Sequence, residues 1–171
     1  GKDLVILSAG ALMDAALRSR LEAAASRTGR RIYLPSGAVA GLDLMRAGRV
    51  VGFSRLLLRT TKPPAGLDAD VSERICLFRG PAEECVRLFP RNINVAASLS
   101  IASGAVLDVE IWADPQASYN THEVIAEGDF GSADLRLVNH PSPDNPRTSY
   151  LAALSLVALL TNLDSPLQVG A

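Results

Sequence analysis

Two apolar stretches with a helical segment between them decide how the chain begins its fold. They are Asp3-Leu-Val-Ile-Leu-Ser8 and Arg31-Ile-Tyr-Leu34, and the first has the nearly continuous apolar character of a strand that is buried on both faces. Between Leu12 and Thr28 the apolar residues recur at helical spacing, and Gly29 follows as a terminator. The pattern predicts a βαβ unit with parallel strands and a helix lying across them.

The rest of the sequence predicts a second sheet of a different kind. Strands are expected at 50–61, 75–78, 109–113, 124–126 and 135–138, with helices ending near Gly48, starting at Gly80-Pro81, and covering 93–103. The short connections between the last three strands predict an antiparallel meander. A final helix from Tyr150 to about Leu163 is apolar over most of its surface, so we expect it to be buried. The predicted fold class is α/β, with an α+β second part on a mixed or antiparallel sheet.

Composition and missing motifs exclude several functions. The 171 residues carry a formal net charge of −1, so the chain lacks the basic surface of a nucleic-acid-binding protein. No apolar run reaches the length of a membrane span, and we expect a soluble, cytoplasmic protein. Cys76 and Cys85 stand in apolar surroundings and are expected to be buried, reduced thiols rather than metal ligands. No HExxH, paired CxxC, GxSxG or Walker motif occurs.

The residue best suited to acid–base chemistry is His122, in the stretch Asp114-Pro-Gln-Ala-Ser-Tyr-Asn-Thr-His-Glu123. An imidazole titrates near neutral pH, so it can move a proton under cellular conditions. A lone histidine beside a strand is more often structural, however, and the pattern alone leaves both interpretations open. The other histidine, His140, lies between Asn139 and Pro141 without a clear orienting partner.

Three other features have both an ordinary and a functional interpretation. The small-residue segment Pro35-Ser-Gly-Ala-Val-Ala-Gly41 is either a tight turn or a place where a ligand approaches the sheet. Asn94, near the start of a predicted helix, fits a capping role. Lys62 and Arg147 are ordinarily solvated charges, and they become relevant only for an anionic substrate.

Six stretches in the same order along the chain resemble the L-aspartate dehydrogenase family, and the resemblance covers nearly the whole sequence. They are Leu7-Ser-Ala-Gly-Ala11, Leu34-Pro-Ser-Gly-Ala-Val-Ala-Gly-Leu-Asp43, Phe89-Pro-Arg-Asn-Ile-Asn-Val-Ala-Ala-Ser-Leu-Ser100, Ala113-Asp-Pro115, Asn120-Thr-His-Glu123 and Asn145-Pro-Arg-Thr-Ser149. The resemblance implies oxidation of L-aspartate with NAD or NADP, through iminoaspartate, to oxaloacetate and ammonia. The imine can also feed NAD biosynthesis.

The resemblance also implies roles for particular residues. His122 matches the catalytic histidine, while Ala38 and Asn94 match positions that contact the nicotinamide cofactor. No metal is implied. The substrate, L-aspartate, would be bound by residues of the remaining motifs and by the lysine before the paired prolines, which are Asn120, Arg147, Thr148, Ser149 and Lys62. The family implies a remnant of a Rossmann-type dinucleotide-binding domain at 1–36, a catalytic and dimerisation domain at 37–171, and a homodimer formed through the sheet of the second domain.

The sequence departs from the family pattern in three ways. Arg147 stands where members often have lysine, and Thr61 stands where they often have a basic residue. The Gly-rich fingerprint that holds the cofactor pyrophosphate is absent. We therefore expect a truncated, inactive portion of a dehydrogenase. The alternatives are a non-enzymatic binding or dimerisation module, and a dehydrogenase for a related amino or hydroxy acid.

Overall fold

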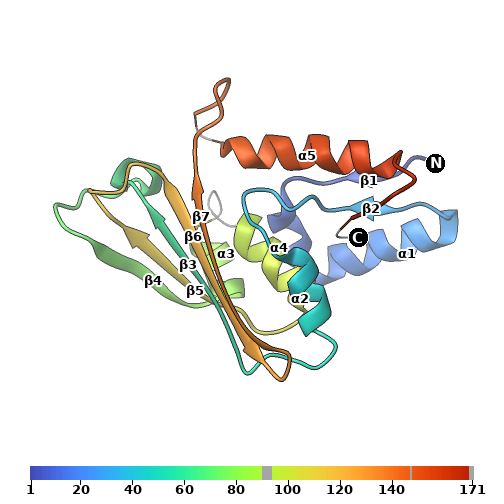
Figure 1. Cartoon of the computed structure of the whole chain (residues 1–171), viewed down its shortest axis with the longest axis horizontal. Helices are drawn as coiled ribbons and strands as arrows, with labels where there is room; N and C mark the ends of the chain where they lie inside the picture. The colour runs from blue at the N-terminus through green and yellow to red at the C-terminus, as the bar shows by residue number, and fades with distance from the viewer. Residues whose placement is uncertain (90–93, 147, 170–171) are drawn as a thin grey trace.

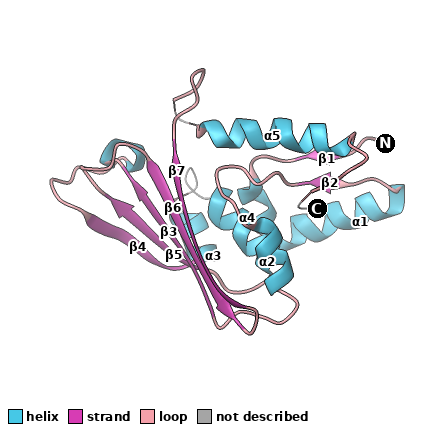
Figure 2. Ribbon diagram, in the orientation of Figure 1, coloured by secondary structure: helices cyan, strands magenta, loops and turns pink. Residues whose placement is uncertain are grey.

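A five-stranded sheet carrying helices on one face forms the larger part of the molecule, and a small βαβ unit with the last helix lies beyond those helices (Figure 1). The structure is a computed structural model that describes residues 1–89, 94–146 and 148–169. Figure 2 shows the same division between the strands of the large sheet and the helical layer beside it. No helix among the described residues has the length and apolar character needed to cross a membrane.

The first unit confirms the predicted βαβ arrangement. β1 (Leu4–Val5) pairs in parallel with β2 (Ile32–Tyr33), and α1 (Ala15–Thr28) connects them after a 3₁₀ turn, η1 (Ala9–Met13). The helix begins where Asp14 Oδ1 accepts hydrogen bonds from the two backbone N–H groups of residues 16 and 17. It ends at Gly29, whose φ of 63° suits glycine.

Both strands of this unit are shorter than the apolar runs that predict them. The expected burial on both faces is not seen, because Leu4 and Leu7 are 42% and 39% exposed. α1 has no buried residue at all. Hydrophobic content therefore predicted the secondary structure here correctly, but it overestimated how much of this unit is covered by the rest of the described chain.

The large sheet has the strand order β4-β5-β3-β6-β7. Its strands are β3 (Arg55–Lys62), β4 (Ile75–Pro81), β5 (Asp108–Ala113), β6 (Asn120–Gly128) and β7 (Gly131–Asn139). β3 pairs in parallel with β5, and all other pairs are antiparallel. The predicted meander of the last three strands is wrong, because β5 and β6 lie on opposite sides of β3. The segment between them passes the end of β3, where the Asp114 N–H donates to the Lys62 carbonyl at 2.9 Å.

The β6–β7 pair is a hairpin with a two-residue turn between Gly128 and Gly131, which pair with each other. A turn this short fixes the register of both strands. Asn120 therefore stands directly opposite Asn139 at the far end of the hairpin. β3 starts later than predicted, at Arg55, because residues 48–52 form a turn closed by the Gly52 N–H on the Gly48 carbonyl at 2.8 Å.

The hydrophobic core lies between the large sheet and α2 (Leu42–Gly48), α3 (Ala82–Leu88) and α4 (Asn94–Ser103). Small residues let α4 pack closely against α2 and the 3₁₀ turn η1, and six of its ten residues are buried. Leu58 of β3, Leu99 of α4 and Ile111 of β5 are each at most 1% exposed. Burial of each such side chain contributes about 1.5–3 kcal/mol to folding.

The last helix, α5 (Tyr150–Leu163), has the predicted bounds but not the predicted burial. Leu154 and Val157 are 44% and 60% exposed, and Ser155 is the buried residue of the helix. The helix contacts the segment after β2, where the Gly37 N–H donates to Ser155 Oγ at 3.0 Å. The expectation of a buried helix is therefore wrong for the described chain, since a sequence pattern shows an apolar surface without showing what covers it.

Candidate functional site

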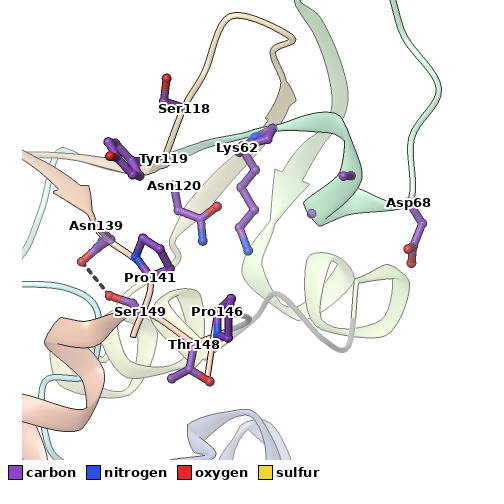
Figure 3. A pocket seen from close by; sticks show the side chains of 13 residues that line it. Lys62, Asp68, Ser118, Tyr119, Asn120, Asn139, Pro141, Pro146, Thr148 and Ser149 are labelled. Atoms are coloured by element: carbon purple, nitrogen blue, oxygen red, sulfur yellow. Dashed lines mark hydrogen bonds between the residues drawn. The ribbon is translucent and has the colours of Figure 1, made fainter. Parts of the chain in front are cut away.

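A pocket of about 560 Å³ lies at the end of the large sheet where β3 and β7 finish and β6 begins. Its size suits a small molecule. Thirteen side chains line it (Figure 3), and they are Lys62, Pro63, Ala65, Gly66, Asp68, Ser118, Tyr119, Asn120, Asn139, Pro141, Pro146, Thr148 and Ser149. They come from three strand ends, the turn after β3 and the loop before α5.

Four of the five residues predicted to bind substrate line this pocket together. Lys62 and Asn120 come from neighbouring strands on the same face of the sheet, and Figure 3 shows both side chains pointing into the same space. Thr148 and Ser149 lie on the other side of that space. The fifth, Arg147, falls outside the described residues. Burial lowers the pKa of the Lys62 ammonium, because desolvation disfavours its charged form.

His122 lies one row below Asn120 on the same face of β6, roughly 6.7 Å further along the strand. It does not line the pocket, and only 5% of it is exposed. Its Nδ1 is 3.0 Å from Oγ1 of Thr60, the residue opposite it on β3, which is 1% exposed. This hydrogen bond fixes the plane of the imidazole ring.

The imidazole of His122 is neutral at physiological pH. Its pKa is lowered to about 4, first because burial disfavours the charged ring and second because the Lys62 ammonium repels a second positive charge. When Nδ1–H donates to Thr60, the other ring nitrogen has a free lone pair and can accept a proton. A carboxylate bound beside Lys62 would raise the pKa of both groups, because opposite charge favours their protonated forms.

The turn that contains Ala38 is joined to this pocket. The Ala38 carbonyl accepts a hydrogen bond of 3.0 Å from Nδ2 of Asn139, a residue of the pocket wall. Gly37 and Gly41 have φ values of 67° and 81°, which explains the glycines at these turn positions. The structure thus places this small-residue segment in a tight turn beside the pocket.

Asn94 is placed differently from the other predicted residues. It is the exposed first residue of α4 and does not line the pocket. Its Oδ1 accepts a hydrogen bond of 3.3 Å from the Gly10 N–H, which connects α4 to the 3₁₀ turn after β1. This contact shows a structural role for Asn94 beside the cofactor role implied by resemblance.

Sequence reasoning missed Thr60 and Asn139. The signal for both is strand register, because a two-residue turn between the glycines at 128 and 131 places Asn139 opposite Asn120. Thr60 could be identified as the partner of His122 only if β3 were known to lie beside β6, and no local pattern shows this. The expectation that His140 has no clear orienting partner was also wrong, since its ring lies against that of Tyr119 with centroids 4.3 Å apart.

Neither cysteine is among the residues that line this pocket. No group of three His, Cys, Asp or Glu side chains suited to a metal ion occurs in the part of the chain that the structure describes. Cys76 is half-buried and Cys85 is buried, and both are free thiols. Burial raises the pKa of the Cys85 thiol to about 11, so it is unreactive at neutral pH.

Fold and pocket together define an α/β protein with a small-molecule site at the end of a mixed sheet. The profile of the family described as "Aspartate dehydrogenase, C-terminal" matches residues 43–163. The L-aspartate dehydrogenase of Methanospirillum hungatei is 52% identical over 170 residues, covering 99% of this chain and 68% of the relative. That of Methanosarcina acetivorans is 43% identical over 184 residues, with the same coverage of both chains.

The solved structures agree with the sequence relatives. The crystal structure of aspartate dehydrogenase from Thermotoga maritima superposes with a TM-score of 0.84 and 31% identity, over 96% of this chain and 67% of that one. The chain belongs to the aspartate dehydrogenase family, whose members are oxidoreductases. A nicotinamide cofactor is therefore implied in general, and these relatives do not favour a non-enzymatic module.

Proposed function

We propose that the pocket between Lys62, Asn120 and Thr148 binds L-aspartate and that His122 is the acid–base group of its oxidation. The observation that carries this proposal is the neutral, buried imidazole one strand row below the pocket, held by Thr60 at 3.0 Å. The family supports aspartate as the substrate, because the relatives are named L-aspartate dehydrogenases.

Substrate binding follows from the charges and donors around the pocket. L-aspartate carries two carboxylates, and the ammonium of Lys62 is a suitable partner for one of them. The amide of Asn120 and the hydroxyl of Thr148 can donate to the other, and Ser149 lies beside them with its own hydroxyl proton donated to Asn139. We include Arg147 among the substrate ligands on the strength of its place in the motif. A fork-shaped guanidinium there would bind a carboxylate through two parallel bonds.

The chemical role of His122 is proton transfer. The cofactor, when bound, would accept the hydride that leaves the substrate Cα. Before that transfer the substrate ammonium must lose a proton, and the free ring nitrogen of neutral His122 can take it. Once His122 has released this proton to solvent, it can accept one from the water that adds to the imine carbon, so that ammonia leaves and oxaloacetate forms. A positioned general base contributes about 10²–10⁴-fold to such a reaction.

We further propose that Ala38 and Asn94 contact NAD or NADP. The turn at 36–40 suits the nicotinamide end, because its small side chains leave its backbone accessible and Asn139 holds it beside the pocket. The described residues contain no Gly-rich loop for the pyrophosphate. We assign residues 1–36 to a dinucleotide-binding domain of Rossmann type, and residues 37–171 to the catalytic domain. The parallel β1–β2 pair and the exposed Leu4 and Leu7 support this division.

We propose a homodimer through the face of the large sheet that faces away from the helices. No element of the described chain covers that face (Figure 1), and the apolar side chain of Val138 on it is 44% exposed. A homodimer with twofold symmetry brings the same surface of two subunits together. Sedimentation of the purified protein would test this, and a monomer at micromolar concentration would refute it.

We place the enzyme in the cytoplasm, where free thiols such as Cys76 persist. Its imine product can serve NAD biosynthesis.

The catalytic assignment is tested with the complete gene product, assayed for aspartate-dependent reduction of NAD and of NADP. We expect His122→Asn to lower kcat by about 10²–10⁴-fold, because the substituted amide cannot act as a base at neutral pH. His140→Asn is the matched control, since the ring of His140 is exposed and stacks on Tyr119. Equal turnover of the two variants would refute the role of His122, and the ratio of rates with NAD and NADP gives the coenzyme preference.

A further inference from the structure

Two side chains from distant parts of the chain hold the backbone of the turn at 36–40. Ser155 of α5 accepts from the Gly37 N–H at 3.0 Å, and Asn139 of β7 donates to the Ala38 carbonyl at 3.0 Å. The second contact spans 101 positions of sequence. The N–H of Gly37 and the carbonyl of Ala38 are thus both held from outside the turn, and these two bonds determine where Ala38 lies.

The orientation of the Asn139 amide is fixed by its partners. A carbonyl can only accept, so Nδ2 must face Ala38, and Oδ1 is left to accept from the Ser149 hydroxyl at 2.9 Å. Only 4% of Asn139 is exposed. Water therefore cannot replace a lost partner at low cost, and an unsatisfied buried amide or carbonyl would be unfavourable.

Ser149 gives a second sign that this arrangement is specific. It is the N-cap residue of α5, with extended φ and ψ of −61° and 133°, yet its side chain makes no capping hydrogen bond. Its hydroxyl donates to Asn139 instead, as the dashed line in Figure 3 shows. The N-cap position normally uses a serine hydroxyl to accept from the first turn of the helix. Here the hydroxyl connects the pocket wall to β7.

We infer that Asn139 is a positioning residue of the dehydrogenase, whose amide holds the Ala38 turn at a fixed distance from the Ser149 side of the substrate pocket. The inference rests on the proposed role of Ala38 at the nicotinamide. Hydride transfer requires donor and acceptor carbons at close range in one orientation, and a displacement of about 1 Å can cost 10²-fold in rate. Asn139 acts on that distance without touching the reacting atoms.

The test compares two substitutions of Asn139 in the complete gene product. Asn139→Asp has nearly the same shape, but its carboxylate cannot donate to Ala38. We expect kcat at pH 8 to fall by about 10–100-fold, with saturating aspartate and cofactor. As the pH falls, the protonated carboxyl regains a donor, so the ratio of the variant's kcat to that of the wild type should rise. Burial raises the pKa of such a carboxyl and brings this recovery into the accessible range.

Asn139→Ser separates this effect from a loss of folding. The serine side chain is too short to reach Ala38 at any pH, so its kcat ratio to the wild type should stay low and constant while that of Asn139→Asp recovers. The titratable groups near the site are Lys62, Asp68, Tyr119, His122 and His140, and all are shared by the three proteins. The Asn139→Ser ratio therefore shows the pH dependence that these shared groups give without a carboxylate at position 139.

The outcomes are distinct. A kcat of Asn139→Asp equal to that of the wild type, or a loss that does not change with pH, would overturn the inference. A merely structural role would lower the melting temperature and the fraction of folded enzyme without a pH-dependent kcat per folded molecule. His122→Asn in the same assay reports on the proposed base independently. If that variant were fully active while Asn139→Asp showed its recovery, the proposed function of His122 would fail and the inference would stand.

Discussion

The two faces of the large sheet both carry polar residues across its strands, but they use them in opposite ways. On the helix-covered face, Thr60 and His122 form a neutral pair that is at most 5% exposed. On the other face, neighbouring positions of the same strands form a row of alternating charge from β4 to β7, which consists of Arg79, Glu110, Arg59, Glu123 and Arg136. Successive residues of one strand thus belong to two different electrostatic environments.

The outer row is stabilised by pairing, whereas the inner pair is kept neutral. Glu110 accepts from Arg59 Nε at 2.8 Å and from Trp112 Nε1 at 2.9 Å, and its second oxygen lies 3.1 Å from Arg79. Burial alone would raise the pKa of Glu110, but these donors outweigh burial and lower it. Among the described residues no anion offsets the burial of His122, so its pKa falls. A buried group that has a partner of opposite charge is suited to structure, and a neutral buried base is suited to proton transfer.

The largest effect we expect from this difference is a pH dependence of stability that originates at His122. Its pKa is about 4 in the folded chain against 6.5 for the ordinary side chain, so protonation of the unfolded chain costs stability as pH falls from 6.5 to about 4. The loss amounts to about 3 kcal/mol. Urea unfolding of the wild type and of His122→Gln at pH 7 and pH 4.5 measures this loss. Carboxylates contribute equally to both proteins, so the difference between the two changes in the free energy of unfolding belongs to His122. Parallel pH profiles would contradict the neutral inner pair.

On the outer face, Glu110→Gln should destabilise the fold by about 2 kcal/mol, because Arg59 and Arg79 lose their shared anion while both stay partly solvated. The activity of the folded fraction should be unchanged. Unfolding by denaturant, followed by kcat per folded molecule, checks both statements. A variant that keeps its stability but loses turnover would show that the outer row takes part in the reaction.

Lys62→Met should separate the two effects of the lysine in the pocket. We expect the KM for aspartate to rise about tenfold, since a charge-assisted hydrogen bond contributes about 1.5–3 kcal/mol. The pKa of His122 should rise, because the positive charge that lowers it is gone. The acidic limb of kcat/KM should therefore move to higher pH. Lys2→Met, at the other lysine of the chain, is the control. If the acidic limb of Lys62→Met stayed at the wild-type pH, the ammonium of Lys62 would not lower the pKa of the catalytic base.

The smallest effect should come from the exposed ion pair between Arg55 and Glu127, which lies on the outer face at the end of β3 and β6 away from the pocket. The atoms are 3.0 Å apart, but the side chains are 52% and 41% exposed. Water and salt screen such pairs, so Glu127→Gln should change the free energy of unfolding by less than about 1 kcal/mol. A loss as large as that of Glu110→Gln would mean that pairing strength on this face does not depend on burial.

The sequence predicted local structure better than it predicted relations between distant segments. The βαβ unit and the bounds of α5 followed from periodicity and from Gly29 as a terminator, because both depend on neighbours in the chain. The position of β3 between β5 and β6 did not follow, since it depends on pairing over more than 40 residues. The exposure of α5 was also missed, because an apolar helix does not show which surface covers it.

The candidate site divides in the same way. His122 and the pocket residues Lys62, Asn120, Thr148 and Ser149 were singled out from the sequence chiefly by resemblance, and the structure brings the four pocket residues together above the histidine. Asn139 carried no local signal, because its partner at Ala38 lies 101 positions away. Thr60 is one of several threonines and becomes notable only when it is placed opposite His122.

The two-residue turn of the β6–β7 hairpin sets how much length variation the site can tolerate. Residues of the two strands pair from Gly128 and Gly131 outward, so each position on β7 has one fixed counterpart on β6. Insertion of a single residue into β7 would turn its side chains to the opposite face beyond the insertion and remove Asn139 from the pocket. Apart from Asn120, His122 and Asn139, members of the family should therefore vary in the sequence of this hairpin but hold its length constant. A naturally lengthened hairpin would be expected only together with a bulge that restores the register.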